Sequence, residues 1–258
     1  MAEDPSGEQP DPTDRPRHPP VSSAPLTRLQ RAFYVLVRTV LRTFASIWFR
    51  AEVTGRQNLP PSGAYIVAPA HRSNLDTPLM PIITHRNLRA MGKDTLWTSS
   101  KLLAWFLTAV GGFPVARGTA DRTSLRAAEE VVERGEPLIM FPEGTRRNGP
   151  HIWELFDGPA FVAARTGTPI VPIGVGGSET ALGKGAKFPR PVKIAIVIGE
   201  PILPPPREDG ARVPRRVVKE LTAELHQRVQ DLFDEAQQRA GRGDDIVLPH
   251  PDEPPREA

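Results

Sequence analysis

Short apolar runs alternate with helical patterns through the middle of the chain. Runs rich in Val, Ile and Leu are typical of buried strands, and they cover residues 64–68, 137–141, 170–175 and 192–198, with a shorter extended piece at 113–116. Helical patterns occupy residues 102–110, 121–134 and 158–166, and each ends at a glycine. Because strands separated by helices form sheets with helices on their faces, we predict a single α/β domain with a mixed, largely parallel sheet flanked by helices.

Helical periodicity returns after the last predicted strand. Residues 213–239 place their apolar side chains on one face. The buried stripe is expected to contain Val217, Leu221, Leu225, Leu232 and Phe233. We interpret this segment as a helix that packs on the sheet.

Residues 26–50, before the first predicted strand, are apolar on one side and cationic on the other. The window has no acidic residue, and its cations are Arg28, Arg31, Arg38, Arg42 and Arg50. Such an amphipathic helix, or pair of helices, can lie among the headgroups of an anionic leaflet, with a gain of about 1 kcal/mol for each well-placed cation. The alternative is a surface helix that packs on the domain with its arginines in water. The missing acids favour association with an anionic membrane surface.

Both ends of the chain have the composition of disordered segments. Residues 1–25 contain seven prolines, several acids and almost no large apolar side chain, and residues 241–258 are similar. Such segments cannot bury enough apolar surface to offset the entropy of ordering. We therefore expect the folded domain to span residues 51–240.

Composition narrows the possible chemistry. The chain has no cysteine, which excludes disulfides, thiolate metal sites and a cysteine nucleophile. Its six histidines lack the paired spacing of a metal site, so no metal is expected. No uninterrupted apolar run reaches the length of about 18 residues that indicates a membrane span. A net charge of +3 and a pI near 9.5 suit an anionic partner, and nothing points to nucleic acid.

A histidine and an aspartate lie five positions apart after the first predicted strand. His71 follows that strand by three residues, and Asp76 stands where a loop would turn into a helix. A neutral imidazole can take the proton of an attacking hydroxyl, which is worth about 10²–10⁴ in rate. A carboxylate on the other ring nitrogen fixes the tautomer and stabilises the imidazolium. The spacing alone also fits a surface histidine beside an unrelated helix-cap aspartate.

Two further polar clusters follow predicted strands. Residues 141–146, Phe-Pro-Glu-Gly-Thr-Arg, come at the end of the strand at 137–141, and Arg117 follows the extended piece at 113–116. Reactive residues of α/β sheets lie just beyond the carboxyl ends of strands, so three clusters at three strand ends predict one site. An arginine-rich glycine turn suits an anion. We therefore expect group transfer to a hydroxyl of a phosphate-bearing acceptor.

Four blocks of the sequence resemble, in the same order, those of the PlsC-like lysophospholipid and 1-acyl-sn-glycerol-3-phosphate acyltransferases. Residues 71–76 are similar to the H-x4-D block, and residues 112–118 are similar to the second block, which ends in arginine. Residues 141–146 match the third block without a substitution, and residues 170–173 are similar to the fourth. One departure is Ala70, because many members carry asparagine before the histidine.

The resemblance implies direct acyl transfer without an acyl-enzyme. His71 would deprotonate the acceptor hydroxyl, and Asp76 would hold its ring. Arg117 and Arg146 would hold the acceptor phosphate, since a guanidinium grips such a group at two points. Arg72 could also help to bind an anion.

The other block residues would shape the site. Glu143 would bind acceptor hydroxyls or fix the arginines, while Gly144 and Thr145 would let the backbone approach closely. Val171 and Pro172 would form a wall of the acyl or acceptor pocket, although a proline can also mark an edge strand. The apolar residues 102–107 would be a core helix or part of a channel for an acyl chain.

The implied enzyme transfers a fatty acyl group from acyl-CoA or acyl carrier protein to a lysophospholipid, most directly 1-acylglycerol-3-phosphate, giving phosphatidic acid. It would need no cofactor and would sit peripherally on the cytoplasmic face of the cell membrane. A glycolipid or amino lipid could instead be the acceptor, and a non-catalytic lipid-binding protein is a further alternative. A hydrolase is a third, but no Gly-x-Ser-x-Gly motif supports it.

Overall fold

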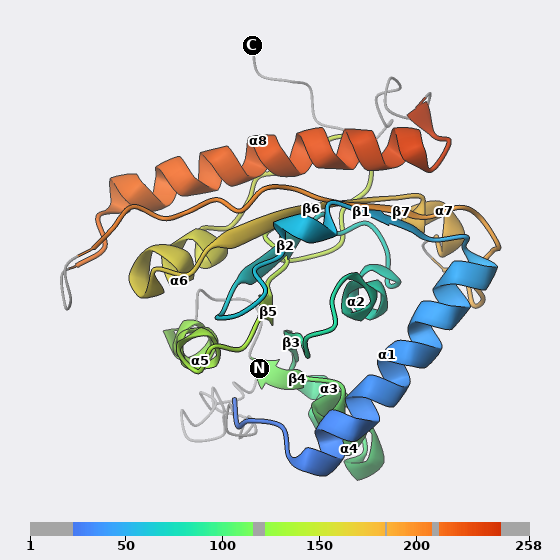
Figure 1. The fold of residues 1–258 in the computed structure, drawn as a ribbon, viewed down its shortest axis with the longest axis horizontal. Helices are drawn as coiled ribbons and strands as arrows, with labels where there is room; N and C mark the ends of the chain where they lie inside the picture. Colours follow the sequence, from blue (N-terminus) through green and yellow to red (C-terminus); the bar gives the residue numbers. More distant parts are fainter. Residues whose placement is uncertain (1–22, 116–121, 184, 208–211, 244–258) are drawn as a thin grey trace, which may run out of the picture.

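A seven-stranded sheet organises the chain (Figure 1). The computed structural model describes residues 23–115, 122–183, 185–207 and 212–243. The strands run across the sheet in the order β1-β7-β6-β2-β5-β3-β4. Their bounds are β1 Glu52–Thr54, β2 Ile66–Pro69, β3 Arg89–Lys93, β4 Gly112–Val115, β5 Leu138–Ile139, β6 Ile170–Gly176 and β7 Ala195–Ile198.

The predicted mixed, largely parallel sheet is confirmed. Among the described strands, only β6 and β7 pair in antiparallel fashion, and the other neighbours are parallel. Because β2 lies between β5 and β6, the segments that leave these three strands emerge at neighbouring positions of the sheet.

Helices cover both faces of the sheet. The core of one face is formed with α5 (Arg122–Glu133), α6 (Gly158–Thr166) and α8 (Arg215–Arg239). The core of the other face includes residues of α1 (Arg28–Trp48), α2 (Asp76–Leu79), η2 (Met80–Ile83) and α7 (Ser178–Ala181). Shorter pieces are η1 (Arg56–Asn58), α3 (Thr95–Thr98) and α4 (Lys101–Ala109). Figure 1 shows α8 along one side of the sheet and α1 along the other.

The last helix packs as predicted, but on a slightly different stripe. Leu221, Leu225 and Phe233 are buried, whereas Val217 and Leu232 are only partly covered. The buried stripe instead includes Val218 and Val229.

Two glycines let α8 approach β6 very closely. A Cβ atom at Gly174 would collide with the backbone of Leu232, and one at Gly176 would collide with the backbone of Ala236. The helix therefore lies directly against the strand backbone.

Residues 28–48 form one helix rather than a pair. Its start has a capping box, in which Thr27 and Gln30 each accept a hydrogen bond from the other's backbone N–H. Tyr34 and Ala45 are buried on the domain side, and the Tyr34 hydroxyl accepts a hydrogen bond from Leu88 N at 3.0 Å. The helix therefore packs on the domain along one stripe.

Two strands and one proline differ from what the sequence pattern predicts. Strands β1 and β3 were not predicted. Pro172 lies in β6, which is flanked by β2 and β7, so the edge-strand reading of this proline is wrong. Among the described residues, no helix combines the length and hydropathy needed to cross a bilayer.

Candidate active site

His71 and Asp76 meet at the end of β2. The strand ends at Pro69, and Ala70 N donates a hydrogen bond to Ile173 O of β6. His71 follows in the loop, and Asp76 opens α2. Nδ1 of His71 and Oδ2 of Asp76 are 3.0 Å apart, so the two side chains form a hydrogen-bonded pair.

Asp76 is held in place by donors from two parts of the chain. Its Oδ2 accepts hydrogen bonds from the backbone N–H groups of Arg72 and Ser73 at 2.6 and 2.7 Å. Its Oδ1 accepts from the hydroxyl of Ser178, at the start of α7, at 2.6 Å. Asp76 and Ser178 are fully buried. Ser178 was not among the predicted site residues, because it lies 102 positions beyond its partner and no local spacing links the two.

The polar cluster after β5 packs around the histidine. The ring of Phe141 stacks on that of His71 with centroids 4.0 Å apart. Arg147 N donates to His71 O at 2.9 Å, which ties the two loops together. The His71 side chain is 11% exposed, so the ring is fixed by its surroundings and still reaches the surface.

Arg72 and Glu143 form a buried ion pair beside the histidine loop. Nη1 of Arg72 donates to both carboxylate oxygens of Glu143 at 2.9 and 2.5 Å, and Nη2 donates to His151 O at 2.8 Å. Burial raises the pKa of Glu143 to about 7, and Arg72 opposes the rise. This geometry pairs Glu143 with Arg72, which is not one of the arginines that the prediction expected it to fix. It also gives Arg72 a protein carboxylate, rather than a substrate anion, as its partner.

The glycine turn exposes the next residues of the cluster. Gly144 has φ of 66°, which favours glycine, and a Cβ atom there would lie 2.6 Å from the ring of Phe156 and would have to displace it. Thr145 and Arg146 are exposed. The guanidinium of Arg147, which was not predicted, lies over Trp153 at 4.9 Å and adds positive charge near Glu143.

Two other predicted residues, Val171 and Pro172, do not join this cluster. Arg117 lies outside the described residues. Val171 and Pro172 are buried within β6, and Val171 packs in the core between the sheet and α1. Neither residue is among those that line the apolar cavity described next.

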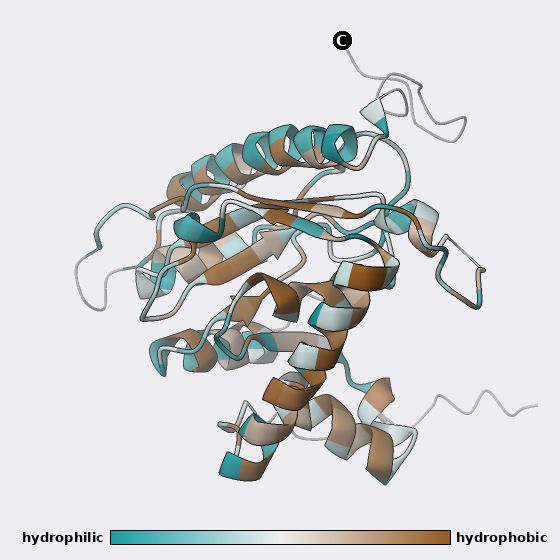
Figure 2. Ribbon diagram, turned by 45° about the vertical axis from the view of Figure 1, so that its right-hand side comes forward, coloured by the Kyte–Doolittle hydropathy of each residue, from teal (hydrophilic) through white to brown (hydrophobic). Residues whose placement is uncertain are grey.

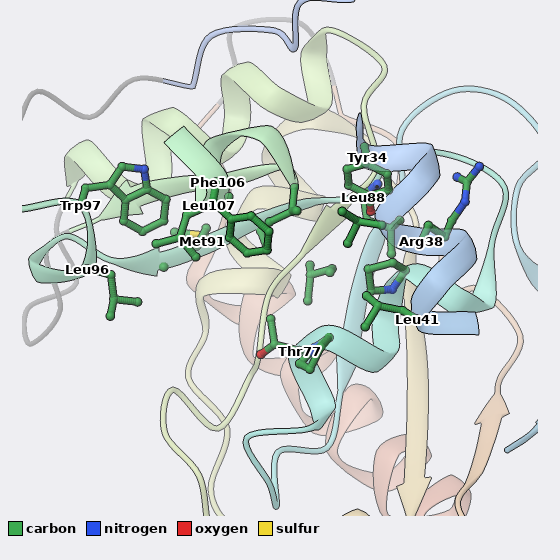
Figure 3. A pocket seen from close by; sticks show the side chains of 18 of the residues that line it. Tyr34, Arg38, Leu41, Thr77, Leu88, Met91, Leu96, Trp97, Phe106 and Leu107 are labelled. Carbon is green, nitrogen blue, oxygen red and sulfur yellow. Dashed lines mark hydrogen bonds between the residues drawn. The ribbon is translucent and has the colours of Figure 1, made fainter. Parts of the chain in front are cut away.

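An apolar cavity of about 370 Å³ opens beside the histidine loop. It is bounded by α1, α2, β3, α3 and α4, with Tyr34, Leu88, Met91 and Phe106 among its lining (Figure 3). Thr77, directly after Asp76, and Ile139, two residues before Phe141, complete its wall. Residues of the predicted 102–107 channel, Phe106 and Leu107, line it as well. The cavity thus reaches the segments that hold the histidine.

The outer surface of α1 and α4 is unusually apolar. Phe33 of α1 packs on Trp105 and Phe106 of α4, with ring centroids 5.2 and 6.0 Å apart. Around this contact Leu29 and Leu102 are 72% and 75% exposed. Figure 2 shows hydrophobic turns on the helices in the lower part of the molecule, where α1 and α4 meet. Exposed apolar area of this kind marks interaction surfaces in proteins.

Comparison with known proteins identifies relatives. Residues 50–176 match the family model described as Acyltransferase. The chain is 25% identical over 201 residues to the 1-acyl-sn-glycerol-3-phosphate acyltransferase of Bacillus subtilis (strain 168), covering 77% of this chain and 96% of that protein. It is 32% identical over 127 residues to the human 1-acyl-sn-glycerol-3-phosphate acyltransferase alpha, but these residues are 48% of this chain and only 44% of the human protein.

A solved structure shares the fold. The crystal structure of the 1-acyl-sn-glycerophosphate (LPA) acyltransferase PlsC from Thermotoga maritima superposes with a TM-score of 0.61 at 24% identity. The match covers 80% of this chain and 83% of that one. This likeness supports the architecture described above.

Proposed function

The chain belongs to the PlsC-like acyltransferase family, and on this premise we propose that it transfers a fatty acyl group from acyl-CoA or acyl carrier protein to a lysophospholipid. The acceptor we assign is 1-acylglycerol-3-phosphate, which becomes phosphatidic acid. The observation that carries the proposal is the hydrogen bond from the His71 ring to Asp76. With Nδ1 engaged, Nε2 is the nitrogen that can act on the acceptor.

The reaction needs one base and no covalent intermediate. Nε2 of His71 accepts the hydroxyl proton while the hydroxyl oxygen attacks the thioester carbonyl carbon. The tetrahedral intermediate then collapses and the C–S bond breaks. The departing thiolate takes the proton back from the imidazolium and leaves as a thiol. The products are an ester and a thiol, and the histidine returns to its neutral state.

Asp76 and Ser178 act through the histidine. Asp76 holds the ring in the tautomer that leaves Nε2 free of its proton, and it stabilises the transient imidazolium. Ser178 holds the second carboxylate oxygen, so the carboxylate cannot rotate away. We assign Ser178 as a positioning residue.

Charged groups beside the histidine would anchor the acceptor phosphate. Arg146 follows the glycine turn and is exposed, so its guanidinium is available to an anion. We assign it, with Arg117, to the phosphate. Thr145 and the backbone of Gly144 would approach the same group.

The apolar cavity would receive an acyl chain. Its lining is almost entirely hydrocarbon, and its wall includes Thr77 and Ile139 next to the reacting residues. The thioester carbonyl can then lie near His71 while the chain is buried.

A thiol-release assay, run with and without the acceptor, tests the proposal. Purified protein is expected to release thiol from a long-chain acyl-CoA only when 1-acylglycerol-3-phosphate is present, and His71→Ala is expected to lower turnover by at least about 10²-fold. Equal release without acceptor would identify a hydrolase. No release with any acceptor in a panel that includes glycolipids and amino lipids would favour a lipid-binding protein. Near-normal turnover of His71→Ala would remove the base role.

We further propose that the α1 and α4 surface rests on the cytoplasmic face of the membrane. The test is co-sedimentation with anionic vesicles of a protein carrying both Leu29→Gln and Leu102→Gln. Leu203→Gln is a matched control, because Leu203 is 73% exposed but lies outside both helices. We expect the double variant to bind less and the control to bind normally, since each leucine contributes apolar burial. Equal binding of both proteins would place the contact elsewhere.

A further inference from the structure

A polar hollow lies beside α1, farther along the helix than Phe33, which meets α4. It has a volume of about 420 Å³ and is bounded by the second half of α1 and the turn after η2. Its lining consists of Arg38, Thr39, Arg42, Thr43, Ser46, Ile47, Ile82, Thr84 and His85. Nothing in the proposed mechanism uses this hollow.

The hollow is built from two segments that contain no acid. Residues 26–51 and residues 77–93 have neither Asp nor Glu, although both are rich in arginine. Arg38 donates to the carbonyl of His85, and Arg56, just behind, donates to the carbonyls of Ile82 and Ile83 at 3.0 and 2.9 Å. These partners are neutral, so they do not cancel the positive charge. The hollow therefore favours an anion.

Arg42 is the cation best placed to receive that anion. It is exposed, and its positive charge acts on Arg56: burial, and then the charge of Arg42, lower the pKa of Arg56. Two arginines that repel each other gain from an anion between them. Next to Arg42 the hydroxyls of Thr43 and Ser46 lie on the same side of α1, while the Thr39 hydroxyl donates to Val35 O of its own helix. Guanidinium and hydroxyl groups together suit a phosphate.

An apolar stripe adjoins this polar face. Leu36, Val40 and Ile47 recur at helical spacing, and they are 60%, 59% and 74% exposed. Ile47 also lines the hollow, so the polar and apolar surfaces are continuous. A ligand with a phosphate at one end and hydrocarbon at the other would satisfy both.

We propose that this hollow binds the headgroup phosphate of an anionic phospholipid, with the lipid's acyl chain along Leu36, Val40 and Ile47. The site is separate from the one that carries His71, and its ligand is not consumed. It would fix the position of α1 relative to the bilayer. If α1 bound lipid only through its overall positive charge, removing any one of its arginines would weaken binding. In the proposed site, lipid binding depends on Arg42.

The test is calorimetric titration of the full chain with dihexanoyl phosphatidylglycerol below its micelle concentration, where no charged surface exists. Arg42→Gln is expected to weaken binding about tenfold, the loss of one charge-assisted contact. Arg28→Gln is the matched control, because it removes an equal charge from an exposed position of α1 outside the hollow. It is expected to bind normally. Both variants should keep the wild-type melting temperature, since glutamine suits a helix as well as arginine does.

Each other outcome decides against the site. Failure of the wild type to bind, or equal losses in Arg42→Gln and Arg28→Gln, would overturn it. Loss of binding in Arg146→Gln with normal binding in Arg42→Gln would place the probe in the proposed active site instead. Binding of inorganic phosphate as tightly as the lipid would overturn the assignment to a phospholipid. The titration reads binding directly, so its failure is distinguishable from a failure of acyl transfer.

Discussion

Replacing Ser178 with alanine removes one of the groups that hold the proposed catalytic carboxylate. The Ser178 hydroxyl lies 2.6 Å from Oδ1 of Asp76, and neither residue is exposed to water. A hydrogen bond to a charged group is worth about 1.5–3 kcal/mol. Asp76 keeps the backbone donors of Arg72 and Ser73 on its other oxygen, so the carboxylate loosens without being lost. The Ser178–Asp76 hydrogen bond is expected to stabilise mainly the transition state, in which the His71 ring becomes an imidazolium. The kcat of Ser178→Ala should therefore fall about 10- to 100-fold while KM changes little.

The assay is steady-state thiol release with saturating acceptor. Thr222→Ala is a matched control, because the Thr222 hydroxyl also donates to a carboxylate, Asp157, at 3.0 Å, but it does so between α8 and α6. This variant should lose similar stability and no kcat. In the background of Asp76→Asn, Ser178→Ala should cost no further activity, because the two residues act as one unit. A kcat for Ser178→Ala equal to that of Thr222→Ala would refute a positioning role.

Three other predictions concern the arginine turn, the buried ion pair and α1. Arg146→Gln should raise the acceptor KM by about tenfold or more with little change in kcat, and an unchanged KM would contradict phosphate binding. Glu143→Gln replaces the carboxyl group beside Arg72 with a neutral amide, and it should change the free energy of unfolding in urea less favourably at pH 5 than at pH 8. Since the folded pKa of Glu143 is raised from 4.5 to about 7, its contribution to wild-type stability falls as pH rises through that interval, and the variant should lack this fall. Tyr34→Phe leaves Leu88 N–H unpaired and should cost about 1–3 kcal/mol, measured by the same denaturation; an unaltered midpoint would show that water replaces the hydroxyl.

The strands and helices that sequence predicted are those with a clear period. Residues 158–166 form α6 with the predicted bounds, and α5 ends one residue before the predicted end at 134. Strand β3 was missed because Arg89 hides its pattern. Its guanidinium is buried, with hydrogen bonds to Gly111 O and Glu136, so a charged residue occupies a core position. Strand β1 has only three residues, too few to show a period.

The site was predictable only where it is local in sequence. His71 and Asp76 lie within one loop, so spacing alone pairs them. Ser178 reaches Asp76 because β6 lies beside β2, and that order of strands is a property of the sheet. The burial of Glu143 against Arg72 likewise depends on the meeting of two loops. Contacts between distant segments require the topology, which periodicity does not supply.

The two glycines in the second half of β6 link the C-terminal helix to the proposed catalytic residues. Because Gly174 and Gly176 bring α8 onto the strand, Gln237 accepts from Gly177 N at 3.0 Å and donates to Glu179 at 2.7 Å, on either side of Ser178. A chimera that exchanges only the last helix for that of a relative would disturb this clamp. A chimera should therefore exchange β6 and α8 together. A chain that ends before Gln237 is expected to lose turnover even where its sheet is still folded.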